Sequence, residues 1–168
     1  VIGFGRIGAA VAQRAAAFGM KIVGYDPLIP GDEIQRRGGK PVTMDELLAE
    51  ADIITMHIPL TADSKNMLNA AAFAKMKQGV YLVCAARGGV IDEEALLAAL
   101  ESGKVAGAGL DVFATEPPGQ TALVNHPRVV CTPHIGAQTV EAQERAAVDI
   151  SSEVLAALRG DALRWRVA

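Results

Sequence analysis

Five polar or charged residues come directly after, or within two residues of, the end of a short apolar segment. They are Asp26 after KIVGY, His57 after DIITM, Arg87 after VCAA, Asp111 after VAGAGL and His134 after VCTP. Carboxylate, imidazole and guanidinium groups bind hydroxyls, transfer protons and hold carboxylates. If the apolar segments are parallel strands, their carboxyl ends meet at the edge of the sheet where α/β proteins bind ligands. We therefore expect these five side chains to line one site.

Each of these residues also has a plain structural explanation. Polar side chains commonly begin loops, so a single His or Asp in such a place is more often a turn residue than a catalyst. Five together, including two of the three histidines, favour a functional site. No metal is expected there, because His57, His126 and His134 lack the spacing of a ligand set.

The segment GFGRIG (3–8) has the spacing of a dinucleotide-binding turn between a strand and a helix. In such a turn Gly3 permits the tight bend, Gly5 lets a pyrophosphate approach the backbone, and Gly8 lets the helix pack closely on the sheet. Asp26 follows after 17 intervening residues, where an acid accepts hydrogen bonds from the adenosine ribose. The glycines alone would also suit an ordinary tight turn, but turn, helix and acid together predict a dinucleotide site.

The acid at position 26 also predicts which dinucleotide binds. A carboxylate within about 4 Å of a 2′-phosphate would meet repulsion on the order of 1–4 kcal/mol at a surface-like dielectric. Arg6 could hold such a phosphate, but its place inside the turn puts it nearer the pyrophosphate. The predicted cofactor is therefore NAD rather than NADP.

Two further motifs suggest acid–base chemistry on a carboxylate-bearing substrate. Arg87, followed by two glycines, offers a planar fork suited to a carboxylate, although it could also be a surface arginine in a glycine turn. His134 lies on a loop stiffened by Pro133, and Glu116 lies on the loop before the preceding strand. A carboxylate beside an imidazole orients a general acid/base and stabilises its protonated form. We therefore expect Glu116 to reach His134.

Short apolar segments alternate with longer Ala- and Leu-rich stretches, which is typical of β-α units around a parallel sheet. Helix ends are predicted by a capping box at Thr43 and Glu46, a cap at Asp92, and Thr139 before a helix that ends near Arg159. The predicted fold class is α/β, a doubly wound parallel sheet of the Rossmann type. The expected strands are 1–4, 20–25, 51–56, 80–85, 105–110 and 129–132.

Composition sets limits on function. The chain has 168 residues, of which 51% are hydrophobic, enough for one compact domain or two very small ones. Its net charge of -3 gives no basic field for nucleic acid. Glycine, proline and charged residues interrupt the apolar runs, so no membrane contact is expected. Cys84 and Cys131 lie far apart in apolar runs, as buried thiols do in a reducing compartment, and a cytoplasmic location is expected.

Six motifs together resemble the nucleotide-binding domain of the D-isomer-specific 2-hydroxyacid dehydrogenases, in the expected order over essentially the whole chain. They are GFGRIG, Asp26-Pro27, HIPLT (57–61), ARGGVIDEEAL (86–96), LDVFATEPP (110–118) and TPHIGAQT (132–139). Within the family, YDPLIP (25–30) and the run through HIPLT are most similar to the members that oxidise D-3-phosphoglycerate in serine biosynthesis. One departure is Cys84, where many relatives have Asn.

The resemblance implies a role for each matching residue. Arg87 would orient the substrate, which is a small 2-hydroxy or 2-oxo acid. His134 would be the acid/base, and Glu116 would be its carboxylate partner. It further implies a homodimer formed through this domain. The helix from Thr139 to Arg159 is suited either to contact the partner subunit or to cover the sheet. The implied cofactor contacts, beside the three glycines, are Arg6, Ile7, Asp26, Pro27, His57, Pro59, Ala85, Ala86, Asp111 and Gly136.

The family fold also implies a second domain. Residues 1–160 are expected to form the dinucleotide-binding domain with a truncated first strand, since only Val1 and Ile2 precede the turn. Residues 161–168 are expected to begin the return to a substrate domain, and the isolated chain should bind NAD but turn over poorly. Two alternatives stay open: a glyoxylate/hydroxypyruvate reductase, expected to have a basic residue in place of Asp26, and an NAD-sensing corepressor.

Overall fold

The computed structural model of the chain describes residues 1–165. It divides into two compact units, Val1–Pro133 and His134–Ala168. Residues 166–168 of the expected return segment, 161–168, lie outside the described residues. Of the helices in the described part, none is both long and apolar enough to cross a bilayer.

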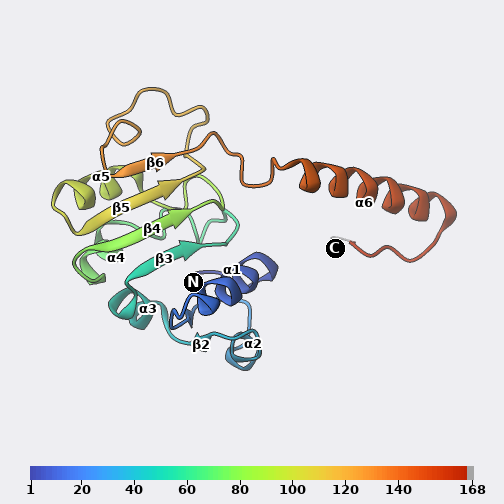
Figure 1. The fold of residues 1–168 in the computed structure, drawn as a ribbon, viewed down its shortest axis with the longest axis horizontal. Coiled ribbons are helices and arrows are strands. Elements are labelled where there is room, and N and C mark those ends of the chain that lie inside the picture. The colour runs from blue at the N-terminus through green and yellow to red at the C-terminus, as the bar shows by residue number, and fades with distance from the viewer. Residues whose placement is uncertain (166–168) are drawn as a thin grey trace. The chain divides into compact units, whose positions relative to one another are not determined.

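The first unit is built on parallel strands (Figure 1). A two-stranded sheet pairs β1 with β2, and a four-stranded sheet has the order β3-β4-β5-β6. The strands are β1 (Val23–Gly24), β2 (Lys40–Pro41), β3 (Ile53–Met56), β4 (Val80–Cys84), β5 (Val105–Leu110) and β6 (Val129–Cys131).

Ile2 joins the two sheets, although the strand expected over 1–4 is reduced to single-residue bridges. Ile2 forms parallel bridges with Tyr25, directly after β1, and with Met56 of β3. Its amide donates to Thr55 O at 2.9 Å, and its carbonyl accepts from His57 N at 2.7 Å. The spatial order is therefore β2, β1, Ile2, β3, β4, β5, β6, which is the doubly wound arrangement. The predicted Rossmann-type fold class is confirmed.

Helices connect the strands of the first unit, and their ends follow local capping chemistry. Thr43 and Glu46 form the predicted capping box, and Asp92 accepts from Ala95 N at 3.1 Å. The sequence pattern does not predict β2, α2 or α4, which are two to six residues long. The helices are α1 (Arg6–Ala17), α2 (Gly31–Arg36), α3 (Met44–Glu50), α4 (Ala70–Lys75) and α5 (Glu93–Glu101).

Two apolar clusters hold the first unit together. The larger packs β3 to β5 against α3, α4 and α5, and its fully buried members include Leu47, Leu82 and Leu100. Burying a side chain of this size contributes about 1.5–3 kcal/mol. The smaller cluster joins α1, α2 and the glycine turn around Phe4 and Ile34. Both clusters fix the strands, and hence the loops that leave their carboxyl ends.

The second unit contains α6 (Val140–Arg159). Thr139 accepts from Ala142 N at 3.1 Å, as predicted for its cap, and Gly160 ends the helix with φ 75°. The helix has no buried residue. After its end the amides of Arg164 and Trp165 donate to the Glu153 carboxylate, so the chain turns back along α6.

Candidate functional site

The glycine turn is shaped by two close backbone approaches. Gly3 has φ +87°, and a Cβ there would lie 2.6 Å from His57 O. A Cβ at Gly8 would lie 1.9 Å from Gly3 O. Any larger residue at either position would push the first turn of α1 away from the strand ends. The positive φ of Gly3 fits the tight bend predicted for it, and the close approach at Gly8 fits the predicted packing of the helix on the sheet.

Gly5 differs from its neighbours because the space beside it is open. It is the N-cap of α1, makes no side-chain cap, and a Cβ built on it would have nothing within 4 Å. Arg6 and Ile7, the first two helical residues, are exposed. A helix N-terminus with free approach to its backbone amides is a ready site for phosphate oxygens. The turn thus fits the pyrophosphate of a dinucleotide.

Asp26 connects the end of β1 to this turn. Its Oδ2 accepts from Phe4 N at 2.7 Å, and its Oδ1 accepts from Leu28 N at 2.8 Å and Ile29 N at 3.1 Å. A carboxylate has about four acceptor positions. The residue therefore both shapes the turn and keeps acceptor capacity for a ribose hydroxyl, while Pro27 beside it is exposed. The spacing of Asp26 from the glycines predicts its role toward the ribose but not its bonds to the backbone of the turn.

His57 and Pro59 follow β3. His57 Nε2 lies 3.0 Å from Thr55 Oγ1, and burial lowers the pKa of the imidazole below its usual value. Pro59 O accepts from Ser64 Oγ at 2.7 Å. Since the Gly3 Cβ position nearly touches His57 O, this strand end and the glycine turn lie side by side. The structure thus brings Gly3, Asp26 and His57 together.

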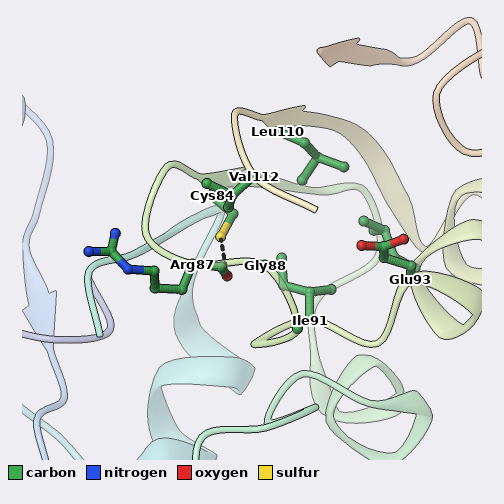
Figure 2. A pocket seen from close by; sticks show the side chains of 9 residues that line it. Cys84, Arg87, Gly88, Ile91, Glu93, Leu110 and Val112 are labelled. Atoms are coloured by element: carbon green, nitrogen blue, oxygen red, sulfur yellow. Dashed lines mark hydrogen bonds between the residues drawn. The ribbon is translucent and has the colours of Figure 1, made fainter. Parts of the chain in front are cut away.

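Arg87 leaves the carboxyl end of β4. Its Nη1 donates to Ala86 O at 2.6 Å, and it is exposed, as is Ala85, whereas Ala86 is buried. Figure 2 shows the guanidinium directed away from a small, mainly apolar pocket beneath the loop. The arginine is therefore available to a ligand at the strand ends.

Cys84 lies at the base of the same loop. It is buried, and its Sγ donates to Arg87 O at 4.0 Å. Burial raises the pKa of this thiol, so the group stays neutral and unreactive near neutral pH. Both described cysteines are free thiols. Cys84 therefore supports the loop and is not a nucleophile.

Asp111 and Glu116 belong to the loop that follows β5. Asp111 is buried; its amide donates to Cys84 O at 2.9 Å and its Oδ1 accepts from Thr132 Oγ1 at 2.5 Å. Glu116 Oε1 accepts from Phe113 N at 3.1 Å. Asp111 thus links the carboxyl ends of β4, β5 and β6, which places this loop beside the one that carries Arg87.

His134 and Gly136 lie in the second unit. His134 begins it, with φ +54°, and both residues are exposed. The left-handed backbone at His134 is uncommon for a residue with a side chain and is enriched at functional sites. Its grouping with Arg87 and Glu116 stays a prediction.

Two residues contact the site without any local sequence signal. Arg37 Nη1 donates to Phe4 O at 2.7 Å, while its Nε donates to Glu33 Oε1 at 2.6 Å. Glu93, the first residue of α5, accepts from Ala114 N at 2.6 Å. The bond from Arg37 to Phe4 joins residues that are 33 apart in the sequence, and the bond from Ala114 to Glu93 joins residues that are 21 apart. Only a knowledge of the fold reveals them.

A family model matches residues 1–136: D-isomer specific 2-hydroxyacid dehydrogenase, NAD binding domain. D-3-phosphoglycerate dehydrogenase of Bacillus subtilis is 51% identical over 95% of this chain and 30% of its own length. D-3-phosphoglycerate dehydrogenase 3, chloroplastic, of Arabidopsis thaliana is 49% identical over 96% of this chain and 28% of its own. The chain therefore spans about 30% of the length of these relatives.

Solved structures agree with this similarity. A glyoxylate reductase from Paecilomyes thermophila has a TM-score of 0.90 and 42% identity, covering 96% of this chain and 49% of that one. The D-lactate dehydrogenase of Aquifex aeolicus, complexed with NAD and lactic acid, has a TM-score of 0.84 and 37% identity. The match covers 95% of this chain and 53% of that one. By its sequence motifs, fold and family match, the chain belongs to the NAD-binding domains of the D-isomer-specific 2-hydroxyacid dehydrogenases.

Proposed function

We propose that this chain is the NAD-binding part of a D-3-phosphoglycerate dehydrogenase, which converts D-3-phosphoglycerate into 3-phosphohydroxypyruvate for serine biosynthesis. The observation that carries the proposal is the 51% identity to the Bacillus subtilis enzyme over 95% of the chain. The intact Arg87, Glu116 and His134 set agrees with a dehydrogenase. The rest of the full-length protein would supply the second wall of the cleft, with residues 161–168 leading into it.

NAD would be held by the glycine turn and by Asp26, whose carboxylate would accept from the ribose hydroxyls. The open space at Gly5 and the amides of α1 support this placement for the pyrophosphate. When bound, NAD supplies the acceptor for the hydride that leaves C2 of the substrate. The further contacts proposed are Arg6, Ile7, Pro27, His57, Pro59, Ala85, Ala86, Asp111 and Gly136.

The chain's own side chains would bind the substrate and move its proton. Arg87 would hold the substrate carboxylate with its planar fork, and this contact fixes C2 in place. His134 would take the proton of the C2 hydroxyl, and Glu116 would stabilise the imidazolium that forms. In the reverse direction the protonated His134 would return that proton to the 2-oxo group.

The test uses the full-length protein. We expect His134→Ala to lower turnover of D-3-phosphoglycerate by roughly 10²–10⁴-fold, the usual contribution of a general acid/base. Calorimetric affinity for NAD should stay near that of the wild type. His126→Ala, the same change at a histidine outside the proposed site, is the matched control. Loss of NAD affinity together with turnover would contradict a purely catalytic role for His134.

A glyoxylate/hydroxypyruvate reductase is the second candidate, favoured by the similarity to the glyoxylate reductase structure at a TM-score of 0.90. Turnover of D-3-phosphoglycerate compared with glyoxylate and hydroxypyruvate separates the two. Asp26 supports the first candidate, because its charge disfavours NADP. NAD binding without turnover of any of these substrates would instead favour a nucleotide-sensing corepressor.

Assembly and location are also part of the proposal. We infer a cytoplasmic homodimer formed through this domain. Exposed apolar side chains on α6, among them Val148, Val154 and Leu158, support a partner contact, and the two free thiols support a reducing compartment. Sedimentation of the full-length protein at twice the mass of one chain would bear out the dimer, and sedimentation as a monomer would contradict it.

A further inference from the structure

The peptide bond between Phe113 and Ala114 is held from two sides. On one side it packs against the loop that carries Arg87, since a Cβ at Gly88 would lie 1.8 Å from Phe113 O and 2.8 Å from Ala114 N. On the other, the Ala114 amide donates to Glu93 Oε1 at 2.6 Å. This peptide therefore lies between the Arg87 loop and the first turn of α5.

The same peptide leads into the segment that carries Glu116. Residues up to Phe113 are buried, whereas Ala114, Thr115 and Glu116 are exposed. Packing accordingly fixes the loop only as far as Phe113. Beyond that residue two hydrogen bonds determine the path of the backbone. Ala114 N donates to Glu93, and Phe113 N donates to Glu116 Oε1 at 3.1 Å.

Glu93 also has an ordinary reason to be acidic. It is the first residue of α5, after the Asp92 cap, where a negative charge interacts favourably with the helix dipole. Glu94 shares that advantage in the same turn and is exposed. What distinguishes Glu93 is its bond to a loop 21 residues further along the chain. Figure 2 shows it across the pocket from Arg87.

We propose that Glu93 is a positioning residue of the dehydrogenase reaction: its carboxylate fixes the loop that carries Glu116 against the loop that carries Arg87. The inference rests on the proposed function, in which Glu116 is the carboxylate partner of His134. Charge-assisted bonds from a backbone amide to a carboxylate are stronger than neutral ones, so this contact is well suited to hold an exposed loop. A small displacement of a catalytic group is enough to slow a reaction.

The test compares Glu93→Ala, Glu93→Gln and Glu94→Ala in the full-length enzyme, with Glu116→Gln as reference. We expect Glu93→Ala to lower kcat for D-3-phosphoglycerate on the order of tenfold with little change in the KM for NAD. The acidic limb of its kcat–pH profile should move to lower pH, as in Glu116→Gln, because an imidazolium without a nearby carboxylate gives up its proton more readily. Glu93→Gln, which keeps an acceptor oxygen for Ala114 N, should recover part of kcat.

Hydrogen exchange adds a readout independent of activity. The Ala114 amide should exchange faster in Glu93→Ala than in the wild type, and at the wild-type rate in Glu94→Ala. Equal kinetics and equal exchange in Glu93→Ala and Glu94→Ala would overturn the inference. So would a Glu93→Ala enzyme that loses thermal stability and activity together while its pH profile is unchanged, since that result indicates only a helix-end role.

The failure of the proposed function gives a different result. In that case the wild-type protein itself would not oxidise D-3-phosphoglycerate or would show no dependence on Glu116. If the wild type is active and Glu116→Gln shifts its pH profile while Glu93→Ala behaves as wild type, the positioning role alone is wrong.

Discussion

Two glycine-containing turns at the same edge of the sheet use their glycines in opposite ways. At Gly5 the position of the missing Cβ faces open space, whereas at Gly88 it lies 1.8 Å from the carbonyl oxygen of Phe113. The first turn leaves room for a ligand, and the second lets two loops of the protein touch. A glycine in a strand-to-helix turn is therefore informative only when its surroundings are known.

The largest expected effect comes from filling the space at Gly88. Gly88→Ala places a methyl group against backbone, which cannot move aside as a flexible side chain would. We expect the free energy of unfolding, measured with urea, to fall by about 3 kcal/mol, the upper range for overpacking. Unchanged stability would show that the two loops separate easily. The glycines of the two turns would then not differ as their surroundings indicate.

Gly5→Ala should produce the complementary result. A methyl group there meets no atom of the chain within 4 Å, so the fold should tolerate it. We expect the Kd for NAD, measured by calorimetry, to rise by roughly tenfold, equivalent to about 1.4 kcal/mol, with unfolding unchanged. Gly109→Ala, which also meets nothing within 4 Å, is the control and should leave NAD affinity intact. Equal effects at both positions would contradict a ligand at the first turn.

Asp26→Asn tests the charge at the edge of the first turn. Removing the negative charge should weaken repulsion of a 2′-phosphate, and we expect the preference for NAD over NADP to narrow by about tenfold, or ~1.4 kcal/mol. The ratio of the two Kd values is the measurement. Asp52→Asn makes the same change before β3, at the opposite edge of the sheet, and should leave that ratio unaltered. If Asp26→Asn leaves the ratio of the Kd values for NAD and NADP unchanged, the Asp26 carboxylate only accepts hydrogen bonds from the backbone of the turn.

The smallest effect is expected at His57, beside the first turn. Burial lowers the pKa of His57 in the folded state, so the unfolded chain takes up a proton first as the pH falls below about 6.5. Stability from this group is fully present above that pH and is lost as the pH drops through the folded-state value. Urea unfolding between about pH 7.5 and about pH 5.5 should show a smaller loss in His57→Gln than in the wild type. A larger loss in the variant would contradict this sign.

Local chemistry explains which features could be predicted from the sequence. The capping box at Thr43, the caps at Asp92 and Thr139 and the dinucleotide turn depend on residues within a few positions of each other, and all are present. Long-range contacts leave no such trace: Arg37 reaches Phe4, and Glu93 reaches Ala114, only because the fold brings them together.

The short elements were unpredictable for a related reason. The two residues of β2, Lys40 and Pro41, are exposed and carry no apolar alternation, so pairing with β1 alone defines them as a strand. The segment expected to be a truncated first strand is bonded on both sides, because Ile2 bridges Tyr25 after β1 and Met56 of β3. The role of His134 stays a prediction.

The two-sided pairing of Ile2 joins the β1–β2 ribbon to the four-stranded sheet. Residues 1–3 lie in the middle of the sheet: Gly3 N donates to Tyr25 O at 2.8 Å, and His57 N donates to Ile2 O at 2.7 Å. Deleting residues 1–3 would remove the bonds that anchor the glycine turn and would separate the β1–β2 ribbon from the four-stranded sheet.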